Sequence, residues 1–239
     1  MIIEPTAAPT GAEIRDVDLS QPLDRDEFAT LEDAFNEHGV VFFRRQSLTP
    51  DQLLAFTRRF GALEFNTFGE QHGLPEYPGI VLISNVEESG REIGVKRAGE
   101  HWHSDMCYTA KPPRGTILYA REVPEMNGLP LGDTCFAATH AAYDGLPDAM
   151  KARIDKRVAV FDFTGRKRAQ TITREQRDTY PAVQHPIVRT HPFTGRKCLY
   201  VMRDDCTGIV GMEDGEARRL IAALADHITR PDYIYRHRW

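Results

Sequence analysis

The chain has 239 residues, of which 41% are hydrophobic, which is enough to bury one sizeable core. Its formal net charge of -5 argues against a protein that binds nucleic acid through a basic surface. No apolar run approaches the length that crosses a membrane, and the first residues lack the charged and apolar regions of a secretory signal. We therefore expect one cytoplasmic domain spanning residues 1–239.

The four cysteines are scattered along the chain, without the paired spacing of a zinc site or the density of a disulfide framework. They are expected to be reduced thiols packed in the protein. Cys107 has an alternative role, because alternation along a strand would put it on the same face as His103 and Asp105. A place in the core is favoured for it over ligation of a metal.

The N-terminal quarter of the sequence is typical of a segment that mixes helices and strands. Helix-capping residues and an apolar period of three to four predict a helix from residue 24 to Gly39 and a second helix from Thr49 to Gly61. A strand is predicted between them, at residues 40–43. Apolar stripes of this kind are typical of core packing, so we expect both helices to be scaffold.

Short strand-like runs dominate from residue 80 onward, and turn residues separate them. The predicted elements are strands at 80–83, around His103, at 116–119 and at 158–161, a hairpin of 186–190 with 197–201, and a last helix at 213–227. Many short strands with few helices favour a sandwich or jelly roll over a parallel sheet of βαβ units.

The sequence Glu-His-Trp-His-Ser-Asp-Met-Cys-Tyr, residues 100–108, carries the clearest sign of chemistry. In an extended strand His103 and Asp105 project to one side, while Trp102, Met106 and Tyr108 point into a core. A His-x-Asp pair completed by a distant second His is the facial triad of non-haem Fe(II) oxygenases. The same three-residue pattern also arises by chance on solvated strands, so the rest of the sequence has to support the interpretation.

Further stretches match a known family in their order along the chain. They are residues 11–14, 17–23, 38–44, 48–50, 59–61, 102–105, 132–134, 142–147, 185–192 and 235–239. Together they resemble the TauD/TfdA family of Fe(II)- and 2-oxoglutarate-dependent dioxygenases. Each stretch alone is a weak signal, whereas the ordered set covers almost the whole chain and is specific.

The resemblance implies an α+β, mainly β fold, a double-stranded β-helix (jelly roll) with flanking helices. It implies that His103 and Asp105 are iron ligands and that Thr134 helps to hold the distal carboxylate of 2-oxoglutarate. The cofactor would be Fe(II), with 2-oxoglutarate and O2 as cosubstrates. The enzyme would hydroxylate a small organic acid and release succinate and CO2. The alternative for Thr134 is an ordinary residue that leads from a turn into a strand.

The C-terminal end departs from the family pattern. Family members continue past the segment similar to residues 235–239 into strands that carry the second iron-binding His and an Arg that pairs with 2-oxoglutarate. We therefore expect the final strands, the third ligand and the Arg to be absent from this chain, and its own activity to be weak. His101, His185, His191 and His237 are expected to be structural or surface residues rather than replacement ligands.

The substrate is less well indicated than the reaction. Where taurine-acting members have a sulfonate-contacting His, this sequence has Asn66, which argues against taurine. Tyr200 would line the substrate pocket or pack in the core. A sulfonate, a carboxylate or an aryloxy acid is compatible with the sequence.

Two other functions are left open. His101-x-His103-x-Asp105 matches the start of a zinc metallo-hydrolase motif, although Met106 stands where that motif has a His. A degenerate family member would bind a small anion or a protein partner without turnover. The scattered aromatic residues permit a homo-oligomer without requiring one.

Overall fold

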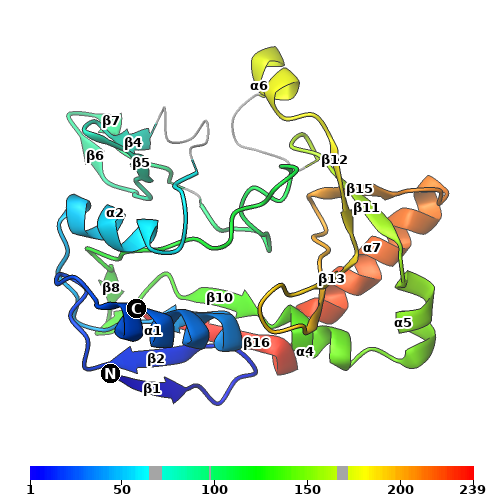
Figure 1. The fold of residues 1–239 in the computed structure, drawn as a ribbon. Helices are drawn as coiled ribbons and strands as arrows, with labels where there is room; N and C mark the ends of the chain where they lie inside the picture. The colour runs from blue at the N-terminus through cyan, green and yellow to red at the C-terminus, as the bar shows by residue number, and fades with distance from the viewer. Residues whose placement is uncertain (65–71, 97, 166–171) are drawn as a thin grey trace.

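The computed structural model describes residues 1–64, 72–96, 98–165 and 172–239 (Figure 1). Its elements in chain order are β1 (Ile2–Pro5), β2 (Ala12–Arg15), α1 (Arg25–His38), β3 (Val41–Phe42), α2 (Pro50–Arg58), β4 (Gly73–Leu74), β5 (Tyr77–Val81), β6 (Glu87–Glu88), β7 (Arg91–Glu92), β8 (Glu125–Met126), β9 (Leu129–Pro130), β10 (Thr134–Ala137), α4 (Thr139–Asp144), α5 (Asp148–Ile154), β11 (Val158–Phe161), α6 (Arg174–Thr179), β12 (Val183–Pro186), β13 (Val188–Thr190), β14 (Lys197–Leu199), β15 (Cys206–Ile209), α7 (Asp214–Ile228), η1 (Pro231–Tyr233) and β16 (Ile234–His237).

Capping residues fix the two N-terminal helices where the sequence predicts them. The Asp24 carboxylate accepts hydrogen bonds from the first free backbone N–H groups of α1, and Gly39 ends the helix with a left-handed φ of 70°. Thr49 caps α2 in the same reciprocal way as Asp24 caps α1. Both predicted helices are confirmed, and their apolar faces enter the core as expected.

A small sheet and these two helices form the first hydrophobic cluster. β2 pairs antiparallel with β1 and parallel with β3, which confirms the strand predicted at 40–43. Figure 1 shows α1 lying alongside this sheet. The buried residues of the cluster are Ile14, Leu19, Leu31, Ala34 and Phe56.

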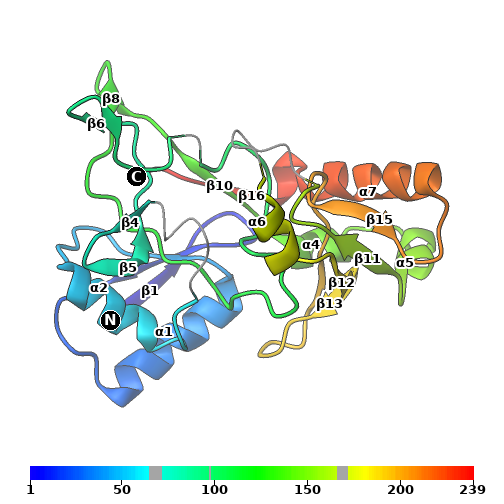
Figure 2. The same ribbon diagram turned by 90° about the horizontal axis from the view of Figure 1, so that it is seen from above.

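A larger hydrophobic cluster fills the other end of the molecule. β11 lies between β12 and β15, and α7 packs along β15 in both views (Figures 1 and 2). Phe161, Ile187, Leu199 and Leu224 are at most 1% exposed in this core. The strand at 158–161, the β13–β14 hairpin and the last helix are all confirmed.

Two predicted strands are absent from the described residues. Residues 116–119 form no ladder, and the Tyr119 side chain anchors them instead by accepting a hydrogen bond from the Leu48 N–H at 3.0 Å. The stretch around His103 is extended chain followed by a turn, because Met106 has a left-handed φ of 48°. The strand predicted at 80–83 lies slightly earlier, as β5.

The described sheets have two or three strands each, so the structure is a mixture of short strands and helices. The double-stranded β-helix remains a prediction. One long-range pairing matters for function: β10 and β16 run antiparallel, with Thr134 opposite His237. This pairing joins residues about a hundred positions apart and holds Thr134 against the C-terminal segment.

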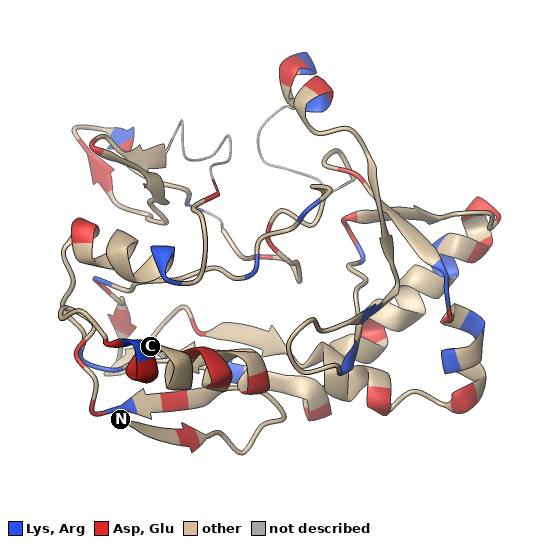
Figure 3. Cartoon of the chain, in the orientation of Figure 1, with Lys and Arg blue, Asp and Glu red and all other residues tan. Residues whose placement is uncertain are grey.

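Acidic and basic residues are interspersed along the chain (Figure 3). Figure 3 shows both signs on α5, α6 and α7, whereas α1 is mainly acidic. Among the described helices, none is long and apolar enough to cross a membrane.

Candidate active site

His103 and Asp105 lie side by side, as the sequence predicts. His103 Nε2 is 3.3 Å from Asp105 Oδ1. A turn rather than a strand brings them together, and it buries Cys107 at 0% exposure in the core. The core position predicted for Cys107 is thus confirmed, whereas Trp102 is 42% exposed and the prediction that it points inward is wrong. The motif therefore has a buried anchor on its C-terminal side and an outward-facing His–Asp pair.

The hydrogen bond at the far side of the imidazole determines its tautomer. His103 Nδ1 lies 2.7 Å from the carbonyl oxygen of His101. A carbonyl oxygen can only accept, so Nδ1 carries the proton and donates it. In the neutral ring Nε2 then has only a lone pair, and this lone pair faces a carboxylate oxygen of Asp105. Two facing acceptors call for a cation between them, which is either a proton or a metal ion.

A metal ion fits this pair. Two neighbouring ligands, each about 2.1 Å from a metal, lie about 3 Å apart when their bonds meet at a right angle. The observed 3.3 Å between Nε2 and Oδ1 is close to that spacing. Histidine ligands usually donate their other ring N–H to a carbonyl or carboxylate, as His103 does to His101. The pair thus fits two positions of a facial triad.

The third position of such a triad has no candidate within the part of the chain that the structure describes. No group of three His, Cys, Asp or Glu side chains lies close enough there to hold a metal. His101 instead lies 3.8 Å from Asp204. His185 Nε2 is bonded to the Thr109 carbonyl, and His237 Nδ1 to the Tyr235 hydroxyl, in agreement with the structural roles predicted for them.

Thr134 occupies the first position of β10 and is partly buried. The indole Nε1 of Trp239 donates a hydrogen bond to its Oγ1 at 3.1 Å. Because the hydroxyl accepts there, its own proton is directed elsewhere and is available to an acceptor in the site. Sequence reasoning did not single out Trp239 for this role, since the contact depends on the pairing of β10 with β16.

Tyr200 lies beside the segment that carries His103 and Asp105. Burial raises its pKa to about 12, and the hydroxyl of Ser104, between His103 and Asp105, acts in the opposite direction. The guanidinium carbon of Arg189 lies 4.6 Å from the centre of the Tyr200 ring. Arg189 pairs with Cys198 in the β13–β14 hairpin. Cys198 and Tyr200 are two residues apart and lie on the same face, so strand alternation predicts that Arg189 is a neighbour of Tyr200. Asn66 lies outside the described residues.

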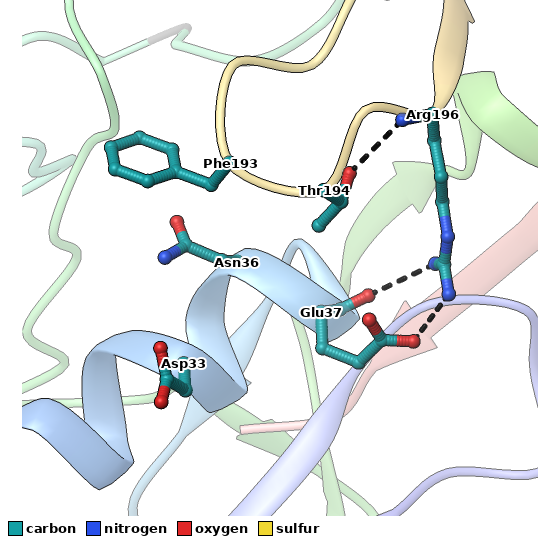
Figure 4. A pocket seen from close by; sticks show the side chains of 6 residues that line it. All are labelled: Asp33, Asn36, Glu37, Phe193, Thr194 and Arg196. Atoms are coloured by element: carbon teal, nitrogen blue, oxygen red, sulfur yellow. Dashed lines mark hydrogen bonds and ion pairs between the residues drawn. The ribbon is translucent and has the colours of Figure 1, made fainter.

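A cavity that is not part of this site lies elsewhere in the described structure. It measures about 490 Å³ and lies between α1 and the β13–β14 turn (Figure 4). The Arg196 side chain pairs there with Glu37, and Phe193 lines the opposite side. His103, Asp105 and Thr134 do not line it, so this cavity is separate from the candidate site.

Known proteins resemble this chain over its whole length. It matches the family described as "Taurine catabolism dioxygenase TauD, TfdA family" over residues 3–239. It is 33% identical over 240 residues to the alpha-ketoglutarate-dependent 2,4-dichlorophenoxyacetate dioxygenase of Cupriavidus pinatubonensis, which covers 95% of this chain and 82% of the relative. It is 31% identical over 246 residues to the (S)-phenoxypropionate/alpha-ketoglutarate-dioxygenase of Sphingobium herbicidovorans, covering 99% and 82%.

A solved structure agrees with these sequence relationships. The crystal structure of a taurine dioxygenase from Burkholderia xenovorans superimposes with a TM-score of 0.75 at 30% identity, covering 100% of this chain and 76% of the other. The family resemblance seen in the sequence is therefore confirmed. The chain belongs to the TauD, TfdA family and is a dioxygenase that depends on 2-oxoglutarate (alpha-ketoglutarate), with Fe(II) as its metal and O2 as its oxidant.

Proposed function

We propose that this dioxygenase hydroxylates a small organic acid, and that an aryloxyalkanoic acid is its substrate in preference to a sulfonate. Two relatives that align with nearly the whole chain carry aryloxy acids in their names. The uninterrupted family match over residues 3–239 supports one catalytic domain. The proposal assigns His103 and Asp105 as iron ligands and Thr134 as a contact of 2-oxoglutarate.

The assignment of the metal site rests on the short distance between two hydrogen-bond acceptors, one on His103 and one on Asp105. His103 Nε2 and Asp105 Oδ1 face each other at 3.3 Å, while the tautomer of the imidazole is set by the His101 carbonyl. The side chains of His103 and Asp105 are 29% and 46% exposed, so ligands from solution can reach the ion. In this arrangement the chain supplies one neutral nitrogen and one anionic oxygen, a donor set suited to Fe(II).

The metal supplies the oxidation when it is bound with 2-oxoglutarate: one atom of O2 enters succinate, the other enters a C–H bond of the substrate, and CO2 leaves. The chain has to hold the cosubstrate in place. Thr134 is suited to donate its hydroxyl proton to a carboxylate, because Trp239 already occupies one of its acceptor positions. A carboxylate that leaves water needs such donors to offset desolvation.

Arg189 is our candidate for recognition of the substrate carboxylate. Among the residues that the structure describes, no carboxylate forms an ion pair with it, and its guanidinium stacks on Tyr200 next to Ser104. A guanidinium binds a carboxylate through two parallel hydrogen bonds, and an aromatic ring below it limits its motion. Hydroxylation of the carbon between the carboxylate and the ether oxygen gives a hemiacetal, which breaks into a phenol and an oxo acid.

The test is coupled turnover of a substrate panel by the purified protein with Fe(II), 2-oxoglutarate and O2. 2,4-Dichlorophenoxyacetate and both enantiomers of 2-phenoxypropionate are compared with taurine. Release of phenol and succinate in equal amounts from an aryloxy acid would support the proposal. Succinate formed only with taurine would overturn the substrate assignment, and no succinate with any acid would favour a non-catalytic family member.

Arg189→Gln gives a second readout. We expect its KM for the aryloxy acid to rise while the affinity for metal stays unchanged, since Arg189 acts on the substrate alone. Arg153→Gln is the matched control, because Arg153 is an exposed arginine whose guanidinium pairs with Glu216 at 2.8 Å. An unchanged KM in Arg189→Gln would exclude Arg189 as the carboxylate contact.

A further inference from the structure

Asp105 makes a different contact with each of its two carboxylate oxygens. Oδ1 faces His103 Nε2 at 3.3 Å. Oδ2 accepts a hydrogen bond from Thr116 Oγ1 at 2.6 Å. This is within the range of a hydroxyl donating to a charged carboxylate, about 2.5–2.7 Å. The hydrogen bond from Thr116 therefore engages Oδ2, while Oδ1 is the oxygen that faces His103 Nε2.

Thr116 is held firmly although its segment forms no strand. Two residues before it, Arg114 donates to Glu32 at 2.6 Å and to Asn36 at 3.1 Å, which ties the segment to α1. Gly115 lies so close to α1 that a Cβ there would meet the Phe35 ring at 3.0 Å. The hydroxyl donor is thus fixed by side-chain contacts to a helix rather than by a β-ladder.

We propose that Thr116 is a positioning residue for the metal site: its hydroxyl holds the Asp105 carboxylate so that Oδ1 alone is presented to the ion. The inference rests on the proposed function, because it takes His103 and Asp105 as the ligands. Without this hydrogen bond the carboxylate loses one restraint on rotation about its Cβ–Cγ bond, and the direction of Oδ1 is less well fixed. Hydrogen bonds to ligating carboxylates of this kind typically change metal affinity by about 10–100-fold.

The expected effect lies at the lower end of that range. Asp105 has 46% of its side chain exposed, so water replaces part of the lost hydrogen bond. Thr116→Val has nearly the same shape without the hydroxyl, and we expect it to weaken Mn(II) binding about tenfold. Thr116→Ser keeps the donor and should retain affinity near that of the wild type.

The experiment measures Mn(II) affinity by electron paramagnetic resonance, in the absence of O2, for the purified protein and four variants. These are Thr116→Val, Thr116→Ser, Asp105→Asn and, as a matched control, Thr207→Val, whose hydroxyl donates to the Val160 carbonyl at 3.5 Å. Thermal unfolding without metal checks that each variant folds. Loss of affinity in Thr116→Val with rescue in Thr116→Ser would support the inference.

The other outcomes separate the two proposals. Normal binding by Thr116→Val together with lost binding by Asp105→Asn overturns the role of Thr116 and leaves the metal site standing. Normal binding by Asp105→Asn overturns the metal site itself, and the inference with it. Equal weakening in Thr116→Val and Thr116→Ser would also overturn the inference, since the hydroxyl would then not be the cause.

Discussion

Replacement of Asp105 by Asn should separate metal binding from folding. The amide keeps an oxygen that accepts from Thr116 and gains an N–H group that can donate to His103 Nε2. A new hydrogen bond contributes about 0.5–1.5 kcal/mol, and this one lies at the low end because both side chains are partly exposed. A domain of this size shifts its Tm by about 2–4 °C per kcal/mol. Without metal, the variant should therefore melt at the wild-type temperature or a few degrees above it.

The rise in Tm on addition of Mn(II) should be large in the wild type and small in Asp105→Asn. At a Mn(II) concentration about 100 times the wild-type Kd, binding stabilises the folded state by about 2.7 kcal/mol. That free energy corresponds to a rise in Tm of about 5–11 °C for a chain of this length. Asp105→Asn loses the anionic ligand, so its Tm should barely respond at the same concentration.

The assay is thermal unfolding under nitrogen, with and without Mn(II), followed by far-ultraviolet circular dichroism. Asp204→Asn is a matched control, because Asp204 also lies beside a histidine, at 3.8 Å from His101, and its side chain is 42% exposed. It should keep the full metal-induced shift. A full shift in Asp105→Asn would refute the metal site. If Asp105→Asn without metal melts well below the wild type, the interpretation of His103 Nε2 and Asp105 Oδ1 as two facing acceptors is refuted. Such a loss would mean that a proton already bridges these two atoms in the wild type.

Three further predictions concern stability, measured by urea unfolding. Asp24→Ala removes the cap of α1 and should cost about 1 kcal/mol, whereas Asp24→Asn, which keeps an acceptor, should cost much less. Leu199→Ala opens a cavity at a position that is 1% exposed and should cost about 2–5 kcal/mol. Burial, aided by the charge of Arg44, lowers the pKa of His237 from 6.5. The unfolded chain then binds this proton at higher pH than the folded chain, so stability falls as the pH drops below 6.5. His237→Gln should flatten that fall, and an equally steep fall in the variant would contradict the assignment.

The elements that the sequence predicts well are those whose signals are local. Asp24 and Gly39 bound α1 through contacts within one turn of the helix, and the strand at 158–161 appears at the predicted residues. The run at 116–119 has the same apolar character but forms no strand. Ile117 and Leu118 are 36% and 43% exposed. A strand needs a partner, and the composition of one segment does not say whether a partner lies beside it.

The difference between local and long-range signals also applies to the site, where His103 and Asp105 could be predicted and Thr116 and Trp239 could not. A histidine and an aspartate two residues apart stay within reach of each other in a strand and also in the turn that the structure has, so their proximity could be predicted although the backbone was wrong. Thr116 and Trp239 reach the site through a tie to α1 and through the β10–β16 pairing, and neither contact has a local signal. Spacing along the chain thus indicates which atoms can share a metal. Two details depend on contacts that only the folded chain makes. They are which oxygen of Asp105 faces the metal and the direction in which Thr134 donates its hydroxyl proton.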